Sequence, residues 1–286
     1  ASNRAGSPGF LGPNAPKSQQ HALILGLDRP TSGTATIGGR PYATLREPLR
    51  TAGALLDAQA AHGSRTARDH LRCLAVSNRL PDRRADEVLE ETGLATVAGR
   101  RIKTFSLGMR QRLGIATALL GDPPVLLLDE PANGLDPEGI VWIRQLLRRL
   151  AEEGRTILVS SHLMNETATY ADHLVVLARG RLLADVSMPD FIEQHSQARV
   201  RVRAGDPARL RATLLGDGYT VLGDEDGGWV VEGARAEQVG AVAAREGIPV
   251  LELADERASL EQAYLALTAD EAEFAAATAA PTTPTT

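Results

Sequence analysis

The chain has 286 residues, 43% of them hydrophobic and 3% aromatic, so it can build one large domain, or a large and a small one, around an aliphatic core. A formal net charge of −5 argues against a nucleic-acid-binding protein, since such proteins usually carry a basic face. The single cysteine, Cys73, excludes an intramolecular disulfide framework and a multi-cysteine metal site, which fits a reducing cytoplasm. No stretch reaches the roughly 20 apolar residues that span a bilayer, and no secretory leader is expected.

The N-terminal region raises the question of nucleotide binding. Residues 1–20 are rich in Gly, Pro, Ser and Asn, which predicts loop, with Phe10 in a strand that enters the segment GPNAPKS. This segment resembles the phosphate-loop pattern G-x-x-x-x-G-K-[ST], because Lys17 and Ser18 are present. The spacer is one residue short, however, and Pro16 stands where a glycine precedes the lysine. Proline lacks an N–H and fixes φ near about −65°, so it removes a donor from a loop that holds phosphate through backbone N–H groups.

Short elements follow this segment. Residues 21–26 predict an apolar helix, and residues 34–40 predict a hairpin-like turn. Residues 52–60 predict an apolar strand that enters a loop, and residues 65–98 a helical region with a break at Leu80-Pro81.

The segment from residue 103 to residue 130 contains the first candidate site residues. Ser106 precedes a helical run, where it acts as an N-cap or as part of an anion site at a helix start. Residues 125–130, VLLLDE, predict a strand buried on both faces that ends in Asp129 and Glu130. The carboxyl end of such a strand is where open α/β sheets bind ligands, so Asp129 is a candidate magnesium ligand and Glu130 a candidate for activating water. The alternative is an acidic helix cap.

A helix is predicted from Asp136-Pro137 to Gly154, followed by a buried strand in RTILVSSH. His162 lies just past this strand, either as a polar surface group or in contact with a terminal phosphate. Residues 173–186 predict a hairpin that turns at 179–180. Alternation of strands and helices indicates a parallel α/β sheet.

The pattern changes near Ala198. The order β-α-β-β-α-β over the next residues suggests a small ferredoxin-like domain, and residues 270–286 read as a disordered Ala/Thr/Pro-rich tail.

Together, Lys17-Ser18, SLGMRQR, LLLDEP, GLDP and SSH, in this order, resemble the ATP-binding subunits of ABC transporters over residues 9–190. The stretch FSLGMRQRLGIA and the extension from Ala198 to Thr268 look most like the subfamily that exports drugs and antimicrobial peptides. The resemblance implies an ABC-type P-loop NTPase domain with a helical subdomain over residues 1–197, and a C-terminal ferredoxin-like α+β domain over 198–269. It also implies that the strands which precede the phosphate loop in relatives are missing or degenerate here.

The resemblance further implies an ATPase that uses ATP and Mg²⁺. Glu130 would be the catalytic glutamate, His162 the switch histidine and Asp136 the D-loop residue at the dimer interface. Asp57 falls where a glutamine is usual, and Leu107 and Met109 depart mildly from the signature motif. The resemblance implies that Gly12, Asn14, Lys17 and Ser18 bind the phosphates of ATP. Ser106 and Gly108 would contact ATP bound to the other subunit. The implied magnesium ligands are Ser18, Asp129 and Asp57.

The implied partners are a second copy of the chain, in a head-to-tail homodimer, and a separate membrane permease that docks on residues 57–80; no nucleic acid is expected. The location implied is cytoplasmic, peripheral at the inner face of the cell membrane. The transported substrate is chosen by the permease and cannot be read from this chain. A soluble ATPase of translation or DNA repair is a rival, but the tandem ATP domains or long coiled-coil insertions usual in those proteins are not visible.

Three interpretations of the altered phosphate loop remain open. The coding sequence is truncated or mis-framed, in line with a start at Ala1 rather than Met; or the chain is a non-catalytic pseudo-ATPase that binds partners; or it is a working enzyme with an unusual loop. Resequencing the DNA across the first 25 codons separates the first interpretation from the others.

Overall fold

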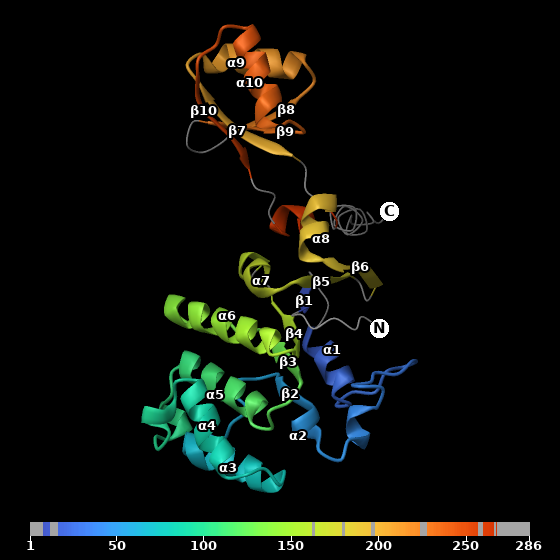
Figure 1. Ribbon diagram of the computed structural model, residues 1–286, viewed down its shortest axis with the longest axis vertical. Coiled ribbons are helices and arrows are strands. Elements are labelled where there is room, and N and C mark those ends of the chain that lie inside the picture. Colours follow the sequence, from blue (N-terminus) through green and yellow to red (C-terminus); the bar gives the residue numbers. More distant parts are fainter. Residues whose placement is uncertain are drawn as a thin grey trace, which may run out of the picture. The chain divides into compact units, whose positions relative to one another are not determined.

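The computed structural model describes residues 8–11, 17–161, 164–178, 181–195, 198–223, 228–256, 260–265 and 267 (Figure 1). The chain divides into two compact units, residues 1–188 and 189–286. This division falls before the expected domain boundary at residue 197. Among the described residues, no helix is long and apolar enough to cross a membrane.

The first unit is built on a six-stranded sheet in the order β2-β3-β4-β1-β5-β6. All neighbouring strands pair in parallel except β5 and β6, which form an antiparallel hairpin. The sheet therefore agrees with the α/β class expected from the sequence. The strands are β1 (Pro8–Leu11), β2 (Ala52–Leu55), β3 (Val125–Asp129), β4 (Thr156–Ser160), β5 (His173–Ala178) and β6 (Arg181–Ser187).

The strand expected around Phe10 is confirmed, whereas the loop expected over residues 1–20 is wrong at residues 17–20, which form the start of a helix. Pro8–Leu11 is a strand that pairs with β4 on one side and with β5 on the other. Helix α1 (Lys17–Ile24) begins at the lysine itself and includes Lys17 and Ser18. Local Gly and Pro content alone is typical of loop, and pairing on both edges of β1 stabilises the expected strand against that propensity.

Helices cover both faces of this sheet. Helix α1 packs on β3, and α6 (Pro137–Glu152) packs on β4 from the opposite side (Figure 1). Asp136 caps α6 by accepting a hydrogen bond from the Gly139 N–H at 2.9 Å, and Gly154 ends it with φ of 89°. The predicted start and end of this helix are thus confirmed. The other helical segments are η1 (Tyr42–Thr44), α2 (Pro48–Thr51), η2 (Ala95–Val97), η3 (Ile102–Thr104), α7 (Met164–Tyr170) and α8 (Met188–His195).

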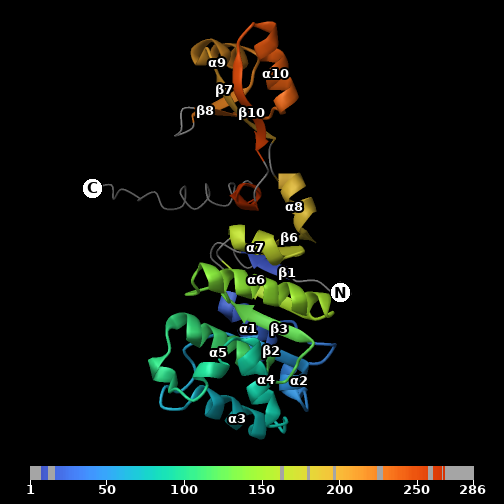
Figure 2. The same ribbon diagram turned by 60° about the vertical axis from the view of Figure 1, so that its left-hand side comes forward.

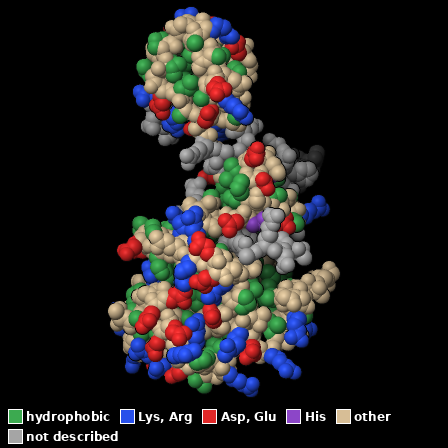
Figure 3. Space-filling model, viewed as in Figure 1, with side chains coloured by type: hydrophobic (Ala, Val, Ile, Leu, Met, Phe, Trp, Pro, Cys, Tyr) green, Lys and Arg blue, Asp and Glu red, His purple; other side chains and the backbone are tan. Residues whose placement is uncertain are grey.

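Three helices form a separate group beyond β2 in both ribbon views: α3 (Ala67–Ser77), α4 (Arg83–Glu91) and α5 (Leu107–Leu119) (Figures 1 and 2). Helix α5 packs on β2, and α4 packs on both α3 and α5. This is the helical subdomain that the resemblance implied. Acidic and basic side chains are interspersed over its surface (Figure 3).

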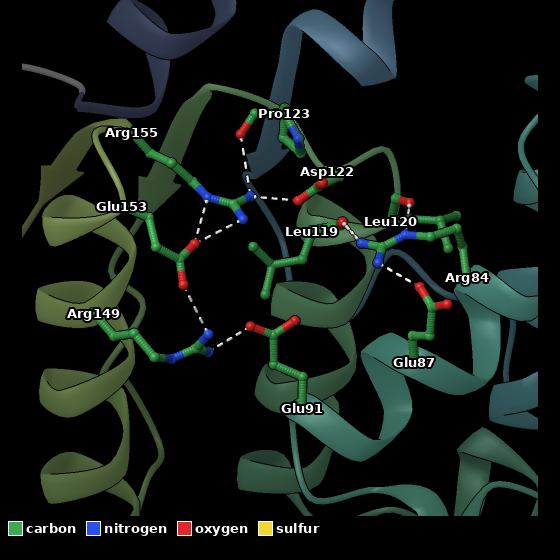
Figure 4. Close-up of polar contacts among 10 residues, drawn as sticks. All are labelled: Arg84, Glu87, Glu91, Leu119, Leu120, Asp122, Pro123, Arg149, Glu153 and Arg155. Atoms are coloured by element: carbon green, nitrogen blue, oxygen red, sulfur yellow. Dashed lines mark hydrogen bonds and ion pairs between the residues drawn. The ribbon is translucent and has the colours of Figure 1, made fainter.

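A polar network joins this group to the sheet (Figure 4). Arg149 on α6 reaches both Glu91 on α4 and Glu153, and Arg155 binds Glu153 and Asp122. About two turns earlier on α4, Arg84 donates hydrogen bonds to the carbonyls of Leu119 and Leu120 at 3.0 and 3.2 Å. These carbonyls end α5 and lack partners within their own helix. Arg84 therefore satisfies the C-terminal end of α5 from a neighbouring helix.

We expect Arg84→Met to destabilise the first unit by about 2 kcal/mol, because the buried Leu120 residue loses the side-chain donor to its carbonyl and the Leu119 carbonyl keeps only the Asp122 N–H. The adjacent variant Arg83→Met is the matched control. The Arg83 side chain is 80% exposed and, among the described residues, forms an ion pair with Glu87 alone, at 3.5 Å, so its loss should cost less than about 0.5 kcal/mol. Urea unfolding followed by circular dichroism measures both. Equal losses for the two variants would contradict this role of Arg84.

The second unit contains a four-stranded sheet in the order β10-β7-β9-β8, with every neighbouring pair antiparallel. Strands and helices follow one another as β-α-β-β-α-β, as the sequence pattern indicates. Alternate residues of β7, such as Val200 and Val202, are fully buried against the helices. The elements are β7 (Arg199–Ala204), α9 (Pro207–Gly216), β8 (Thr220–Gly223), β9 (Trp229–Glu232), α10 (Ala236–Arg245) and β10 (Val250–Glu256).

Candidate active site

The candidate site lies at the carboxyl edge of the parallel strands. Asp129 ends β3 and is in register with Ser160, which ends β4. Strand β1 lies on the other side of β4 and leads into α1, so its end falls at the same edge. The topology thus brings together segments that are far apart in the sequence, at the position where open α/β sheets bind ligands.

Asp129 is held by its neighbour in the sheet. The hydroxyl of Ser160, a buried residue, donates a hydrogen bond to Oδ1 of Asp129. Asp129 itself is half-buried. A carboxylate oriented by a second-layer hydroxyl at a strand end suits a hard cation such as Mg²⁺. The sequence identified Asp129 but gave no role to Ser160.

Glu130 has an unusual backbone, with φ of 47°. Three hydrogen bonds hold this residue in the left-handed conformation: its N–H donates to the Ser160 carbonyl at 3.0 Å, and its carbonyl accepts from the Asn133 N–H at 3.0 Å and from Nε2 of Gln111 at 2.9 Å. A non-glycine residue kept in this region costs energy and is typical of functional sites. The arrangement turns Glu130 out of the strand direction, which a simple helix cap would not require.

Gln111 was not identified from the sequence. It lies on α5 and is only 4% exposed, and its amide ties that helix to the turn after β3. Gln111 is part of the SLGMRQR stretch, where a buried glutamine on a helix is the signal that could have revealed it.

Ser106 and Gly108 lie at the start of α5. The hydroxyl of Ser106 accepts a hydrogen bond from the Met109 N–H at 3.2 Å, so the N-cap role is confirmed. Ser106 is exposed and Gly108 half-buried. A Cβ on Gly108 would lie 3.2 Å from the Gly134 carbonyl, so α5 passes close to the turn that precedes α6. The start of α5 and the Asp136 cap of α6 are therefore neighbours.

Asp57 follows β2 and is exposed, and its Oδ1 accepts a hydrogen bond from the Gln59 N–H at 2.7 Å. Since β2 pairs with β3 in parallel, Asp57 lies at the same edge of the sheet as Asp129. It borders a mostly apolar hollow of about 310 Å³ between the segment after β2 and helices α3 and α5. Among the residues that line it are Leu55, Ala58, Ala61, His70, Leu74, Leu113 and Thr117.

The remaining site residues predicted from the sequence fall at or beyond the limits of the described chain. Lys17 and Ser18 form the first turn of α1, which places their backbone at the carboxyl edge of β1. Gly12, Asn14 and His162 lie outside the described residues. In the part of the chain that the structure describes, no group of three or more His, Cys, Asp and Glu residues is arranged to hold a metal ion.

His70 is a titratable side chain in the lining of the apolar hollow. Burial, followed by the charge of Arg65, lowers the pKa of His70 below its usual 6.5. A histidine with a lowered folded pKa stays neutral in the native state while the unfolded chain takes up a proton below about pH 6.5.

We therefore expect the free energy of unfolding to fall as the pH drops from 7.5 to 5.5. His70→Gln should make this decrease shallower, because glutamine does not titrate. Urea unfolding at four or five pH values measures how the free energy of unfolding changes with pH. The control is His62→Gln, a substitution outside the hollow. Identical pH slopes for His70→Gln and the parent chain would contradict this prediction.

Comparisons with known proteins agree with this geometry. The family model described as "ABC transporter" matches residues 7–133, and one described as a domain of unknown function, DUF8746, matches residues 198–261. A solved structure described as the ATP binding subunit of an ABC transporter superposes with a TM-score of 0.60 and 30% identity, covering 67% of this chain and 82% of that one.

Three curated relatives extend the comparison. The chain is 36% identical to the uncharacterized ABC transporter ATP-binding protein YdbJ of Bacillus subtilis, covering 79% of this chain and 74% of the relative. It is 39% identical to the bacitracin transport ATP-binding protein BcrA of Bacillus licheniformis, covering 69% and 66%. It is 35% identical to the lantibiotic transport ATP-binding protein SrtF of Streptococcus pyogenes, covering 62% and 76%.

Proposed function

Because the chain belongs to the ABC transporter ATP-binding family, we propose that it binds and hydrolyses ATP and thereby drives a separate membrane permease that exports peptide antibiotics. The observation that carries the proposal is the carboxyl edge of the sheet, where Asp129 is oriented by Ser160 and Glu130 is turned out of the strand by Gln111. The substrate class rests on the bacitracin and lantibiotic relatives. The location that follows is the inner face of the cell membrane, through the permease.

The donor set at this edge suits magnesium. Mg²⁺ prefers one or two carboxylates together with phosphate oxygens and water, rather than a cage of protein ligands. Asp129 at the end of β3 and Asp57 just after β2 offer carboxylates at the same edge of the sheet, and Ser18 in the first turn of α1 would add a hydroxyl. These three residues would hold the ion, which neutralises charge on the phosphates of ATP when bound.

The chain's own residues then act on the terminal phosphate of ATP. The start of α1, with Lys17, supplies N–H groups and a positive charge for the phosphates, together with Gly12 and Asn14. Glu130 orients and polarises the attacking water, and His162 with Lys17 stabilises charge that develops on the transferred group. Since hydrolysis of this kind depends on positioning, the hydrogen bonds that fix Glu130 are part of the machinery.

A second copy of the chain completes each site. Ser106 and Gly108, at the start of α5, would reach ATP bound to the partner, and Asp136 would lie at the dimer interface. Ser106 and Asp136 are exposed although both cap helices, so both remain accessible to a partner. A homodimer would then contain two equal sites.

The permease would dock on the apolar hollow beside Asp57. Its walls come from the segment after β2 and from α3 and α5, so its occupant would touch both the sheet and the helical subdomain. A movement of the helical subdomain relative to the sheet would then be transmitted to the permease. The second unit would be a ferredoxin-like domain, supported by its strand order and its antiparallel pairing.

The test of this function is the Mg²⁺-dependent ATPase rate of the full chain and of a variant with a restored phosphate loop. Replacing Ala15-Pro16 with Gly-Ala-Gly supplies the missing residue and the glycine before Lys17. We expect the restored loop to bind ATP at least about tenfold more tightly, because it regains a backbone donor and the φ freedom that Pro16 removes.

The outcome separates the working enzyme from the pseudo-ATPase. Replacing the pair with Ala-Ala-Ala, which adds length without glycine, is the control. If neither the parent nor the restored chain hydrolyses ATP, the chain is a non-catalytic subunit and the proposed activity fails.

A further inference from the structure

We propose that the first unit carries a second anion site, remote from the ATP site, in which Arg46, Arg50 and Arg79 bind a phosphate group. The site is a hollow of about 270 Å³ between the segment around α2 and the C-terminal end of α3. Its lining consists of Arg46, Glu47, Pro48, Leu49 and Arg50 from one segment and Ser77, Asn78, Arg79 and Leu80 from the other. The inference does not depend on the proposed function.

The charges around this hollow are unbalanced. Its lining holds three arginines and one glutamate, and Glu47 lies 3.4 Å from Arg50. No carboxylate of the described residues lies within 4.0 Å of Arg46 or Arg79. By contrast, four arginines on α3 and α4 do pair with carboxylates: Arg68, Arg72, Arg83 and Arg84. Within the described chain, Arg46 and Arg79 thus lack a carboxylate partner, whereas Arg50 has Glu47.

Arg79 occupies a position that favours another residue. Arg79 follows α3 and has a φ of 55°. Two hydrogen bonds close the end of this helix: the Leu80 N–H donates to the Ala75 carbonyl at 2.9 Å, and the Arg79 N–H donates to the Val76 carbonyl at 3.2 Å. This pair of bonds is a Schellman motif, whose left-handed residue is usually glycine. An arginine there costs about 1 kcal/mol relative to glycine, so its presence points to a use for the guanidinium.

The walls of the hollow are fixed before any ligand binds. Leu80 is 7% exposed and anchors the end of α3 in the core. On the other side, a Cβ on Gly121 would lie 1.9 Å from the Leu49 carbonyl, so the backbone of α2 rests directly on the turn after α5. A preformed site loses little entropy on binding.

Phosphate is the ligand class that this lining fits. Guanidinium groups bind phosphate oxygens through paired N–H donors, and three of them match a dianion better than a carboxylate. The hydroxyl of Ser77 and the amide of Asn78 already donate within α3, so the arginines are the main donors left. The apolar part of the lining, Pro48, Leu49 and Leu80, is too small for an acyl chain, which leaves the headgroup or a free phosphate as the bound part.

The hollow is remote from the ATP site. Helix α2 leads into the first residue of β2, and β2 runs parallel to β3. The hollow is therefore at the amino edge of the sheet, whereas Asp129 is at the carboxyl edge, about 13 Å away along a four-residue strand.

The test uses the full chain and the double variant Arg46→Gln/Arg79→Gly, in which glycine keeps the left-handed turn without strain. Arg83→Gln removes a charge from a well-exposed arginine nearby and is the control. Binding is measured by calorimetry with inorganic pyrophosphate, and by sedimentation with phosphatidylglycerol or phosphatidylcholine vesicles. ATP binding is followed in every variant, and pyrophosphate titrations are repeated in a Lys17→Ala background to remove binding at the phosphate loop.

We expect the double variant to lose at least about tenfold in pyrophosphate or phosphatidylglycerol affinity, with unchanged ATP binding and an unaffected Arg83→Gln control. Loss with pyrophosphate alone identifies a soluble phosphorylated ligand; loss with phosphatidylglycerol vesicles identifies a lipid headgroup. Equal binding by the parent and the double variant, or an equal loss in Arg83→Gln, would overturn the proposal. Loss of ATP binding in the Lys17→Ala chain alone would concern the proposed function instead.

Discussion

Glu130→Gln should lower the Mg²⁺-dependent ATPase rate by roughly 10²- to 10³-fold while ATP still binds. The amide preserves size and the backbone hydrogen bonds of Glu130, but it neither accepts a proton nor carries the charge that orients water. The loss should therefore appear in kcat rather than in KM. Release of phosphate, measured against ATP affinity from equilibrium binding, separates the two effects.

The control for this variant is Glu138→Gln, which removes one carboxylate from an exposed position on the first turn of α6. It should hydrolyse ATP at the parent rate. If Glu130→Gln kept more than half of the parent activity in an active chain, the role given to Glu130 would be wrong, and the strained turn at its backbone would need another explanation.

The second large effect concerns stability. Gly53 lies in β2 directly beneath α5, where a Cβ would be 1.9 Å from the Ala118 carbonyl oxygen. Both partners are backbone, so neither rotates away. We expect Gly53→Ala to destabilise the first unit by about 3 kcal/mol or more, since the strand and the helix must separate to admit the methyl group.

Gly99→Ala is the control, because no atom lies within 4 Å of the Cβ it would add. Urea unfolding followed by circular dichroism compares the two variants, with soluble yield as a second measure where Gly53→Ala fails to fold. If Gly53→Ala unfolded at the same urea concentration as Gly99→Ala, α5 would not be seated on β2 as closely as the structure places it.

Periodicity and end signals predicted much of the fold. The apolar run that ends in Asp129 and the helix between Asp136 and Gly154 lie where the sequence places them, because burial and capping act locally there. A strand at Phe10 was likewise expected, but its place in the sheet was not. Nothing in the segment Pro8–Leu11 reveals that strands from the far end of the unit lie on both of its edges.

The candidate site was predicted in part for the same reason. Asp129 and Glu130 stand out because acids follow a buried strand. Ser160 and Gln111 do not, since each acquires its role only when distant segments meet. The left-handed backbone of Glu130 is likewise a product of its three hydrogen-bond partners, and no single residue type encodes it.

The position of β1 also has a consequence for the order of folding. The strand is synthesised before its two neighbours, β4 and β5, which lie about 150 residues further along the chain, with Gly9 opposite both Val159 and Leu174. Parallel pairing over such separations forms slowly, because the chain loses the entropy of closing a long loop before any stabilising contact forms. Until β1 docks, β4 and β5 each present an unpaired edge in the middle of the sheet. The first unit is therefore most prone to misassembly in the period before β1 pairs with β4 and β5.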